Sequence, residues 1–415
     1  MRGRTPGVTP EDVRIALGLR PPPRGAPDGK RMNRTGNVAR AFGGAAAAGG
    51  EREGASESMR VHVELPEELD VVEHGERNAR GEIPDRTPYG LHQIADDDPD
   101  DPVEVTFRRP AHGAVAYGAR KVRNRLNGYE PVTAVTGARQ RRGADVLLTM
   151  DERTGTPAAL TSPRRPVVAG VGWLERPELL ERAHRTASVA ALRRAAAVFT
   201  QSPGMVPILR ADWGLDPERV HGVNLGVDPE FFPYQPWEER DPDGVTVTSV
   251  GDDRNRDHAT LIGAVTQVRA DGIPAWLELA TTLPVDLPAE AGVVHARRMN
   301  AAMRGLYRRS TVVAVALRPN PVGAGLTVAL EALASGRPVV ASDNPGMDWY
   351  VEHGRTGLLV PPGNPRAMAD AVGELLADPD RARRMGEDGR RDVEKRFTTA
   401  HMSDELRAIA RAARS

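Results

Sequence analysis

The amino-acid sequence predicts an α/β protein built from two doubly wound parallel-sheet domains that face a cleft. Its length of 415 residues exceeds what one domain usually holds. In both halves, short aliphatic and β-branched runs alternate with helical patterns, which is typical of parallel sheets covered by helices. Between the halves, residues 234–243 carry two prolines and five charges, as expected of a linker. We therefore expect domains at 59–233 and 244–395, and a helix at 396–415 that packs back on the first domain.

The composition excludes several classes of protein. Basic and acidic residues balance at 56 to 57, which removes the electrostatic case for a nucleic-acid binder. The absence of cysteine excludes disulfides and thiolate chemistry, and the ten histidines are too scattered to form a metal centre. No run approaches the roughly 20 apolar residues of a membrane span, and the N-terminus lacks a secretory pattern. We therefore expect a cytoplasmic protein.

Residues 1–58 differ from the rest of the chain. They are rich in glycine, proline and alanine and contain one aromatic residue, Phe42. Such a segment buries too little apolar surface to offset the entropy lost on ordering. We expect a disordered extension, or one that is not native, because Met59 begins a segment that resembles a chain start entering a strand.

Strands in the first domain are expected where aliphatic runs occur. The candidates are 60–65, 103–107, 145–150 and 166–171, with a weaker one at 197–200. A long helical pattern covers 175–196. These elements alternate, which predicts a parallel sheet.

The second domain has a clearer alternation. Strands are expected at 245–250, 275–280, 292–295, 312–317, 338–342 and 357–360, and helices at 258–270, 299–309 and 326–335 and from 365 onward. The pair Asn364-Pro365 marks a helix start, because asparagine caps a helix and proline fits its first position. In such open sheets, ligands bind beyond the carboxyl ends of the strands, so the function is expected in the cleft between the domains.

A glycine-rich loop after strand 312–317 is the main candidate site. It leads into a helix that begins near Gly325, Leu326 and Thr327. The first amides of a helix lack internal partners and favour anions, so a diphosphate would bind there. Glu331 lies four residues after Thr327, on the same helix face. Its carboxylate could accept hydrogen bonds from the hydroxyls of a ribose, so this segment favours a nucleoside diphosphate.

The surrounding motifs identify a family resemblance. Residues 334–340 (ASGRPVV) follow the helix, then 345–347 (PGM) and 357–360 (GLLV), and upstream lies 223–233 (VNLGVDPEFFP). This order resembles family four of the retaining glycosyltransferases with the GT-B fold, of the glycosyl transferases group one type. The likeness covers roughly residues 190–400 well and 59–190 weakly.

The resemblance implies a retaining glycosyltransferase with two Rossmann-like domains. The second domain would bind a nucleoside diphosphate sugar, and the first would bind the acceptor. No cofactor and no metal are expected. The resemblance implies the catalytic residues Glu331, Arg256 and Arg254, and the donor-binding residues Gly251, Gly325, Leu326, Thr327, Glu331, His295, Gly346 and Met347.

Two positions depart from the family pattern. Relatives carry two glutamates seven residues apart, and the first falls here at Gly323. They also place an arginine directly after the glycine of the first loop, where this chain has Asp252. Arg254 is the candidate to replace that arginine as a phosphate ligand, since a guanidinium binds two phosphate oxygens at once.

The acceptor side is expected in the loop that follows the first strand. Tyr89 and His92 are candidate acceptor contacts there, and His112 is a third. The acceptor would be a saccharide, a lipid-linked sugar or a small molecule, since many relatives glycosylate lipid-linked acceptors. Contact with the inner face of the membrane would follow from a lipid-linked acceptor.

Three alternatives remain open from the sequence. The first is a nucleotide-sugar epimerase, the second a nucleotide-sugar-binding protein of the same fold without transfer activity, and the third a dinucleotide oxidoreductase. The third lacks a Gly-x-Gly-x-x-Gly fingerprint. A metal-dependent transferase would use an Asp-x-Asp motif after an apolar strand, whereas the Asp-Pro-Asp segments here have turn chemistry and lie at 98–100, 241–243 and 378–380.

Overall fold

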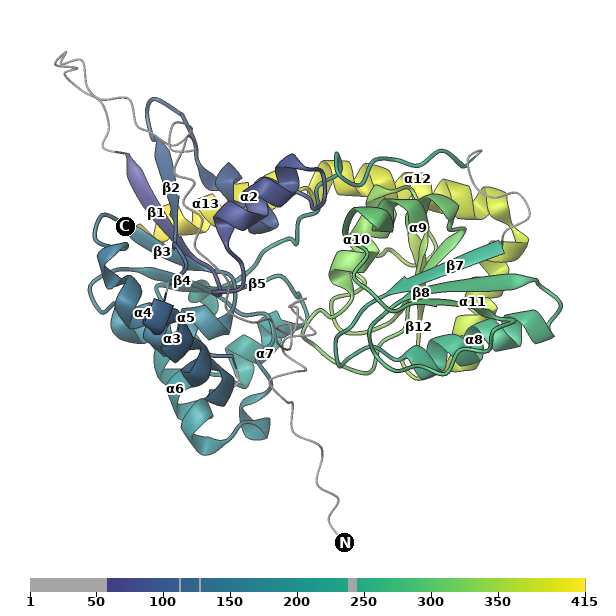
Figure 1. The fold of residues 1–415 in the computed structure, drawn as a ribbon, viewed down its shortest axis with the longest axis horizontal. Coiled ribbons are helices and arrows are strands. Elements are labelled where there is room, and N and C mark those ends of the chain that lie inside the picture. The colour runs from purple at the N-terminus through teal and green to yellow at the C-terminus, as the bar shows by residue number, and fades with distance from the viewer. Residues whose placement is uncertain (1–57, 112, 127, 238–244, 415) are drawn as a thin grey trace, which may run out of the picture.

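The computed structural model describes residues 58–111, 113–126, 128–237 and 245–414. Figure 1 shows two lobes, each a sheet flanked by helices. The expectations for residues 1–57, for His112 and for most of the linker lie outside the described residues.

The first sheet has six parallel strands in the order β2-β1-β3-β4-β5-β6. Alternate residues of one strand pack on opposite faces. Leu147 belongs to a cluster with helices α5, α6 and α7, whereas Leu148 packs with the C-terminal helix. The sheet is therefore covered on both sides. The strands are β1 (Met59–Glu64), β2 (Val103–Phe107), β3 (Val146–Thr149), β4 (Val167–Gly170), β5 (Ala197–Thr200) and β6 (Val220–Gly222).

Helices and short 3-10 turns connect these strands. The α-helices are α2 (Val71–Ala79), α3 (Gly113–Arg125), α4 (Pro131–Thr136), α5 (Glu152–Thr161), α6 (Arg182–Arg194) and α7 (Met205–Ala211). The 3-10 turns are η1 (Pro88–Ile94), η2 (Gly137–Arg139), η3 (Pro177–Leu179) and η4 (Pro217–Arg219).

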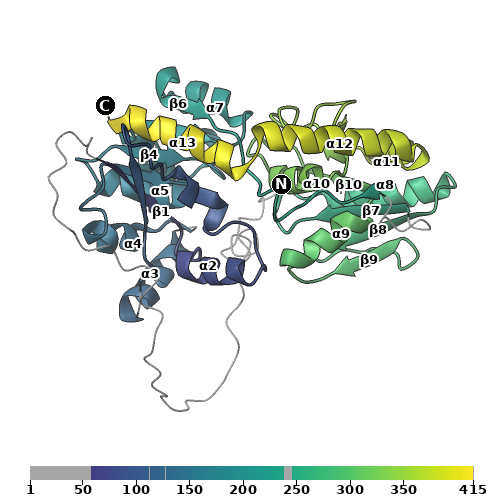
Figure 2. The same ribbon diagram turned by 90° about the horizontal axis from the view of Figure 1, so that it is seen from above.

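The second sheet is also parallel, in the order β12-β11-β10-β7-β8-β9. Figure 2 shows it beside the first sheet from above. Its strands are β7 (Val245–Val250), β8 (Ala275–Ala280), β9 (Gly292–His295), β10 (Val312–Val315), β11 (Val339–Ser342) and β12 (Gly357–Val360). Its helices are α8 (His258–Ala270), η6 (Asn300–Ala302), α9 (Met303–Arg309), α10 (Leu326–Ala334), α11 (Pro365–Ala377) and α12 (Pro379–Arg396).

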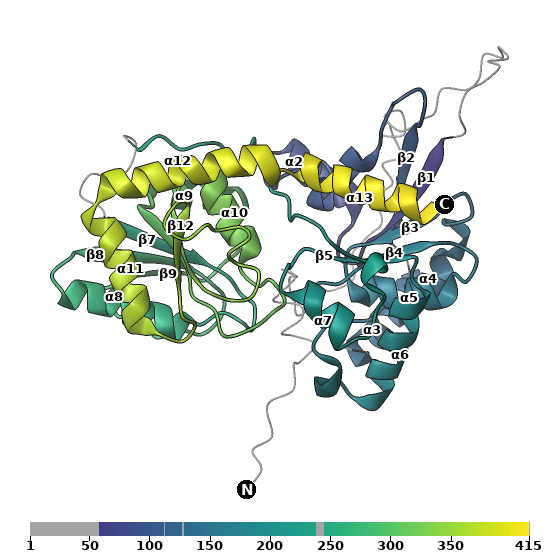
Figure 3. The same ribbon diagram turned by 180° about the vertical axis from the view of Figure 1, so that it is seen from behind.

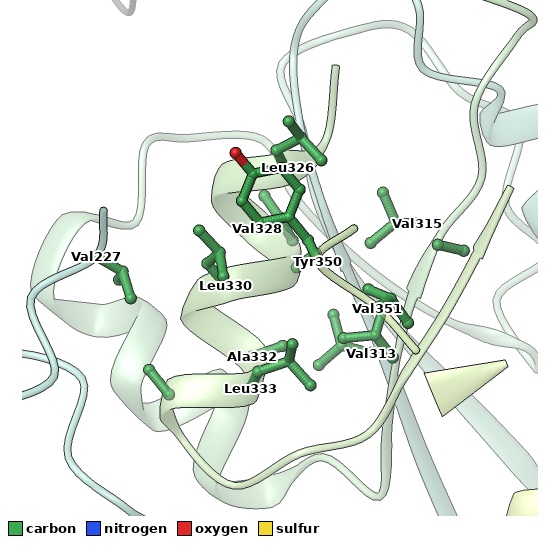
Figure 4. Packing of buried hydrophobic residues seen from close by; sticks show 14 of the residues in the cluster. Val227, Val313, Val315, Leu326, Val328, Leu330, Ala332, Leu333, Tyr350 and Val351 are labelled. Carbon is green, nitrogen blue, oxygen red and sulfur yellow. The ribbon is translucent and has the colours of Figure 1, made fainter. Parts of the chain in front are cut away.

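Helix α10 is buried among apolar side chains of the second domain. Figure 4 shows Leu326, Leu330 and Leu333 of α10 in one apolar cluster with Val313 and Val315 of β10. Such a helix cannot rotate without exposing much apolar surface, at about 25 cal/mol per Å². The core therefore fixes where the N-terminus of α10 points.

The chain returns to the first domain at its C-terminal end. Helix α13 (Thr399–Arg414) lies against the first sheet (Figure 3), and Met402 and Leu406 join its core. At the crossing, Val227 pairs with Thr398. The two domains are thus joined by two adjacent segments.

The predicted fold class is confirmed, and the differences are local. The helix expected at 175–196 begins only at Arg182, because Pro177 starts a separate 3-10 turn. The helix expected at 299–309 divides into η6 and α9, and Asn300 has a positive φ of 43°. Strand β6 was missed because it spans only three residues. Within the described residues, no helix has the length and apolar character needed to cross a membrane.

Candidate functional site

A pocket of about 250 Å³ lies at the carboxyl ends of the second sheet's strands. Its walls come from the loops after β7, β9 and β10, from the start of α10, and from one residue of the first domain. This is the position at which open parallel sheets bind ligands. The lining residues are Trp173, Gly251, Asp252, Asp253, Arg256, Arg298, Gly323, Ala324, Gly325 and Thr327.

Gly325 sets the start of α10. It is the N-cap, with a left-handed φ of 80°, and no side chain caps the helix. A Cβ here would lie 2.6 Å from Val315 Cγ1 and 3.4 Å from Arg256 Nη1. The missing side chain therefore lets the helix end approach Arg256 closely.

The other two residues at this helix start have different roles. Leu326 is buried in the core, and its amide donates to the Gly323 carbonyl at 3.3 Å. Thr327 is exposed and lines the pocket. Of the two, Thr327 is the residue placed to meet an anion, while Leu326 anchors the helix.

Arg256 is the buried cation of the pocket. Its Nε donates to Asp253 Oδ2 at 2.7 Å, and the residue is 8% exposed. The buried Nη1 has no hydrogen-bond partner within the described part of the chain. Gly251 permits this position, since a Cβ on it would lie 2.0 Å from Arg256 Nε. Other buried polar atoms also lack a partner there, but Arg256 in addition lines the pocket beside the start of α10, so its Nη1 is placed where a ligand oxygen could pair with it.

Glu331 lies behind the start of α10 and is half-buried. Its carboxylate accepts a hydrogen bond from the Tyr307 hydroxyl at 2.7 Å. Desolvation raises the pKa of Glu331 to about 7, opposed by the Tyr307 hydrogen bond and by the Arg256 charge. Glu331 is not a lining residue of the pocket, and its partner Tyr307 had no signal in the sequence.

Arg254 makes a contact with the first domain. Its guanidinium forms an ion pair with Glu175 of the first domain, and it is not among the lining residues. Glu175 follows β4 and approaches this loop only once the two domains are together. The role of Arg254 as a phosphate ligand stays a prediction, and in this structure one of its guanidinium nitrogens pairs with Glu175.

Three further predicted donor contacts lie outside the pocket lining. His295 Nε2 bonds Glu278 Oε2 at 3.0 Å, and Glu278 also binds Arg309. Met347 is 2% exposed within the core. A Cβ on Gly346 would lie 2.7 Å from the Gly204 amide, so this glycine is required for contact with the first domain. None of the three lines this pocket, and their roles as donor contacts stay predictions.

The predicted acceptor residues lie in η1, away from the pocket lining. Tyr89 is 39% exposed and has a positive φ of 59°. The ring of His92 bonds Thr87 Oγ1 at 3.2 Å, and burial lowers the pKa of His92. His112 lies outside the described residues. Tyr89 is the more accessible of the two described side chains.

Sequence reasoning missed two lining residues, Trp173 and Arg298. Trp173 follows β4 in the first domain, and its amide donates to the buried Glu152 carboxylate at 3.2 Å. Arg298 lies three residues after β9 ends at His295. Both follow the carboxyl end of a parallel strand, and that rule could have selected them. Among the described residues, no group of three or more histidines and acids could hold a metal ion.

The corresponding edge of the first sheet carries a buried ionic network. Arg153 donates to Asp151 Oδ2 at 2.5 Å and to Glu68 Oε1 at 2.9 Å. Glu68 also pairs with Arg123, and Glu130 lies between Arg123 and a second arginine, Arg108. These charges compensate one another within the protein.

The sequence of this chain is similar to the sequences of several enzymes. Residues 244–378 match the sequence profile described as Glycosyl transferases group 1. Alpha-maltose-1-phosphate synthase of Mycolicibacterium smegmatis is 31% identical over 53% of this chain and 64% of its own. MMP alpha-(1->4)-mannosyltransferase of Mycolicibacterium hassiacum is 27% identical over 60% of this chain and 62% of its own. The chain thus spans less than two thirds of the length of these relatives.

Solved structures share the fold of nearly the whole described chain. Sucrose-phosphate synthase from Thermosynechococcus elongatus superposes with a TM-score of 0.65 at 18% identity, over 85% of this chain and 98% of its own. HepE from Anabaena, solved with UDP and glucose, gives 0.60 at 16% identity over 83% and 97%. The chain therefore has the GT-B fold, and the match to the glycosyl transferases group 1 profile covers residues 244–378, most of the second domain.

Proposed function

We propose that the chain is a glycosyltransferase that moves a sugar from a nucleoside diphosphate sugar to an acceptor hydroxyl, with retention of configuration. The observation that carries the proposal is the buried Nη1 of Arg256 beside the N-terminus of α10, which has no partner among the residues that the structure describes. A guanidinium and a helix end together form a diphosphate site. Retention rests on the resemblance to family four.

We infer roles for the residues that line the pocket and for Glu331 behind it. Arg256 and the helix end at Thr327 would hold the diphosphate and stabilise the negative charge that develops as it leaves. Glu331, one turn deeper, would accept hydrogen bonds from the ribose hydroxyls in addition to the one that it accepts from the Tyr307 hydroxyl. With these cationic and dipolar groups, we propose that transfer needs no metal and no cofactor.

The acceptor would bind on the first-domain side of the pocket. Trp173 is the lining residue from that domain, and an aromatic ring offers a flat apolar surface to a sugar. Tyr89 and His92 are the predicted acceptor contacts further along the same side. We propose that the acceptor is a saccharide, a lipid-linked sugar or a small molecule. The protein would act in the cytoplasm, and a lipid-linked acceptor would bring it into peripheral contact with the membrane.

A thermal-shift panel of UDP-, GDP- and ADP-sugars tests donor binding. One donor at about 100 times its dissociation constant should add about 2.7 kcal/mol of stability. Arg256→Ala should abolish that shift, with Arg176→Ala as a surface control because Arg176 pairs with Asp212 away from the pocket. No shift with any donor, together with a shift from NAD(P)H, would replace the proposal with an oxidoreductase.

A second function, donor binding without transfer, is favoured by Gly323. This glycine lines the pocket where relatives carry a glutamate, with a φ of 69°. A Cβ here would lie 3.0 Å from Ser202 Cβ and 2.8 Å from Leu326 Cδ1, so the chain lacks room for a side chain. An assay for released nucleoside diphosphate distinguishes transfer from binding alone. If a donor binds but is neither transferred nor slowly hydrolysed, the protein only binds it. A changed sugar configuration without acceptor would indicate an epimerase.

A further inference from the structure

Arg298 is a cation of the pocket that the sequence resemblance did not assign. It follows β9, and its side chain lines the pocket together with Arg256. Its guanidinium forms no hydrogen bond and no ion pair with the described residues. The adjacent Arg297 is also exposed but does not line the pocket.

The nearest acid in the pocket is already engaged. Asp252 Oδ1 accepts hydrogen bonds from Thr281 Oγ1 at 3.1 Å and from Thr282 Oγ1 at 3.0 Å, and also from the Thr282 amide. The other acid, Asp253, holds Arg256. Asp252 therefore acts on Arg298 through its charge, and no ion pair joins the two among the described residues.

The electrostatic surroundings of Arg298 also favour an anion. Although the residue as a whole is exposed, partial desolvation of its guanidinium lowers the pKa of Arg298; Asp252 opposes this, and Arg77 of α2 lowers it further. Arg77 belongs to the first domain, where it pairs with Glu82 at 3.3 Å, so its effect on Arg298 is partly compensated. Among the described residues, the uncompensated charge at the pocket is that of Arg298 itself, which a bound anion would neutralise.

We propose that Arg298 is the second arginine that binds the diphosphate of the donor, the role that the sequence suggested for Arg254. This inference rests on the proposed function and assigns one more residue to the same site. Arg256 would hold the diphosphate from the β7 and α10 side, and Arg298 would hold it from the β9 side. A guanidinium donates to two phosphate oxygens in one plane, so two of them fix both position and orientation.

Calorimetric titrations of Arg298→Ala with UDP, GDP and ADP test the inference. With whichever diphosphate the wild type binds, we expect affinity to fall at least 10-fold in Arg298→Ala and less than twofold in the matched control Arg297→Ala. Arg298→Lys should recover part of the loss, because a charge remains without the planar fork. The dependence of affinity on salt should also be weaker in Arg298→Ala.

Titration with the matching nucleoside separates phosphate binding from other roles. Arg298→Ala should leave the weaker nucleoside affinity unchanged. An equal loss for nucleoside and diphosphate, or equal affinities in the alanine variants of Arg297 and Arg298, would overturn the inference. If the wild type bound no diphosphate, both the proposed function and the role of Arg298 would be wrong. If only Arg256→Ala lost diphosphate affinity, the proposed function would stand and the role of Arg298 would be wrong.

Discussion

The carboxyl-end edges of the two sheets place arginines in opposite situations. In the first domain, Arg153 is buried between the carboxylates of Asp151 and Glu68. In the second domain, Arg256 has one carboxylate partner, and its Nη1 has none within the described chain. The edges share a topology and differ in how their charges are satisfied.

This difference separates a structural cluster from a binding site. A buried charge is costly unless it is paired, so the first edge satisfies its cations within the protein. The second edge leaves a guanidinium nitrogen buried beside a helix end and a pocket. Such an arrangement is stable when a ligand supplies the missing acceptor, which is why we place the diphosphate there.

The largest expected effect is on stability and comes from the first edge. Arg153→Ala leaves two buried carboxylates without their shared cation, so it should cost about 3–5 kcal/mol of unfolding free energy. Denaturant unfolding measures this loss. The exposed pair of Arg176 and Asp212 is the control, and Arg176→Ala should cost less than about 1 kcal/mol. Equal costs would mean that the first edge holds no cooperative network.

The next effect is on binding and comes from the second edge. Arg256→Ala should weaken nucleoside diphosphate binding by about 2–4 kcal/mol, or roughly 30- to 1,000-fold. Calorimetry on folded protein measures it. Arg153→Ala should keep its diphosphate affinity at a temperature where it is folded. If the two variants lost affinity alike, the division into structural and binding edges would be wrong.

A smaller effect concerns acids at the junction of the two domains. The Asp85 amide donates to Asp228, and Asp85 Oδ1 accepts from Thr399 at the start of α13. Burial raises the pKa of Asp85 from 3.8 to about 7, and the Asp228 charge adds to the rise. The folded state then binds the proton more tightly than the unfolded state, so stability should fall as the pH rises from about 4 to 7.

Asp85→Asn checks this dependence. The variant should gain about 1–2 kcal/mol over the wild type at pH 8 and nothing at pH 4, because the charge is absent from both proteins in acid. Denaturant midpoints at both pH values measure the difference. A gain that is the same at both pH values would point to packing instead of charge.

The smallest effect is expected at Arg254. Its ion pair with Glu175 is about one third exposed on each side, so Arg254→Ala should cost at most about 1 kcal/mol of stability. Diphosphate affinity should stay within twofold of the wild type. A loss of diphosphate affinity as large as that of Arg256→Ala would mean that Arg254 also binds the phosphates.

Local sequence determined most of the second domain. The strands Val245–Val250, Ala275–Ala280 and Gly357–Val360 have the predicted bounds, as does the helix His258–Ala270. Each is specified by neighbouring residues, such as a β-branched run or, for α8, the cap at Asp257. The start of α10 at Gly325 is encoded in the same local way.

Tertiary structure alone decided which side chains meet in the pocket. Arg254 and Arg256 lie two residues apart, yet one pairs with Glu175 of the other domain and the other lines the pocket. Met347 entered the core, whereas Trp173 and Arg298 reached the site from loops that are distant in sequence. Secondary structure depends on contacts within a few residues, but the partner of a charge depends on how distant loops are brought together by folding.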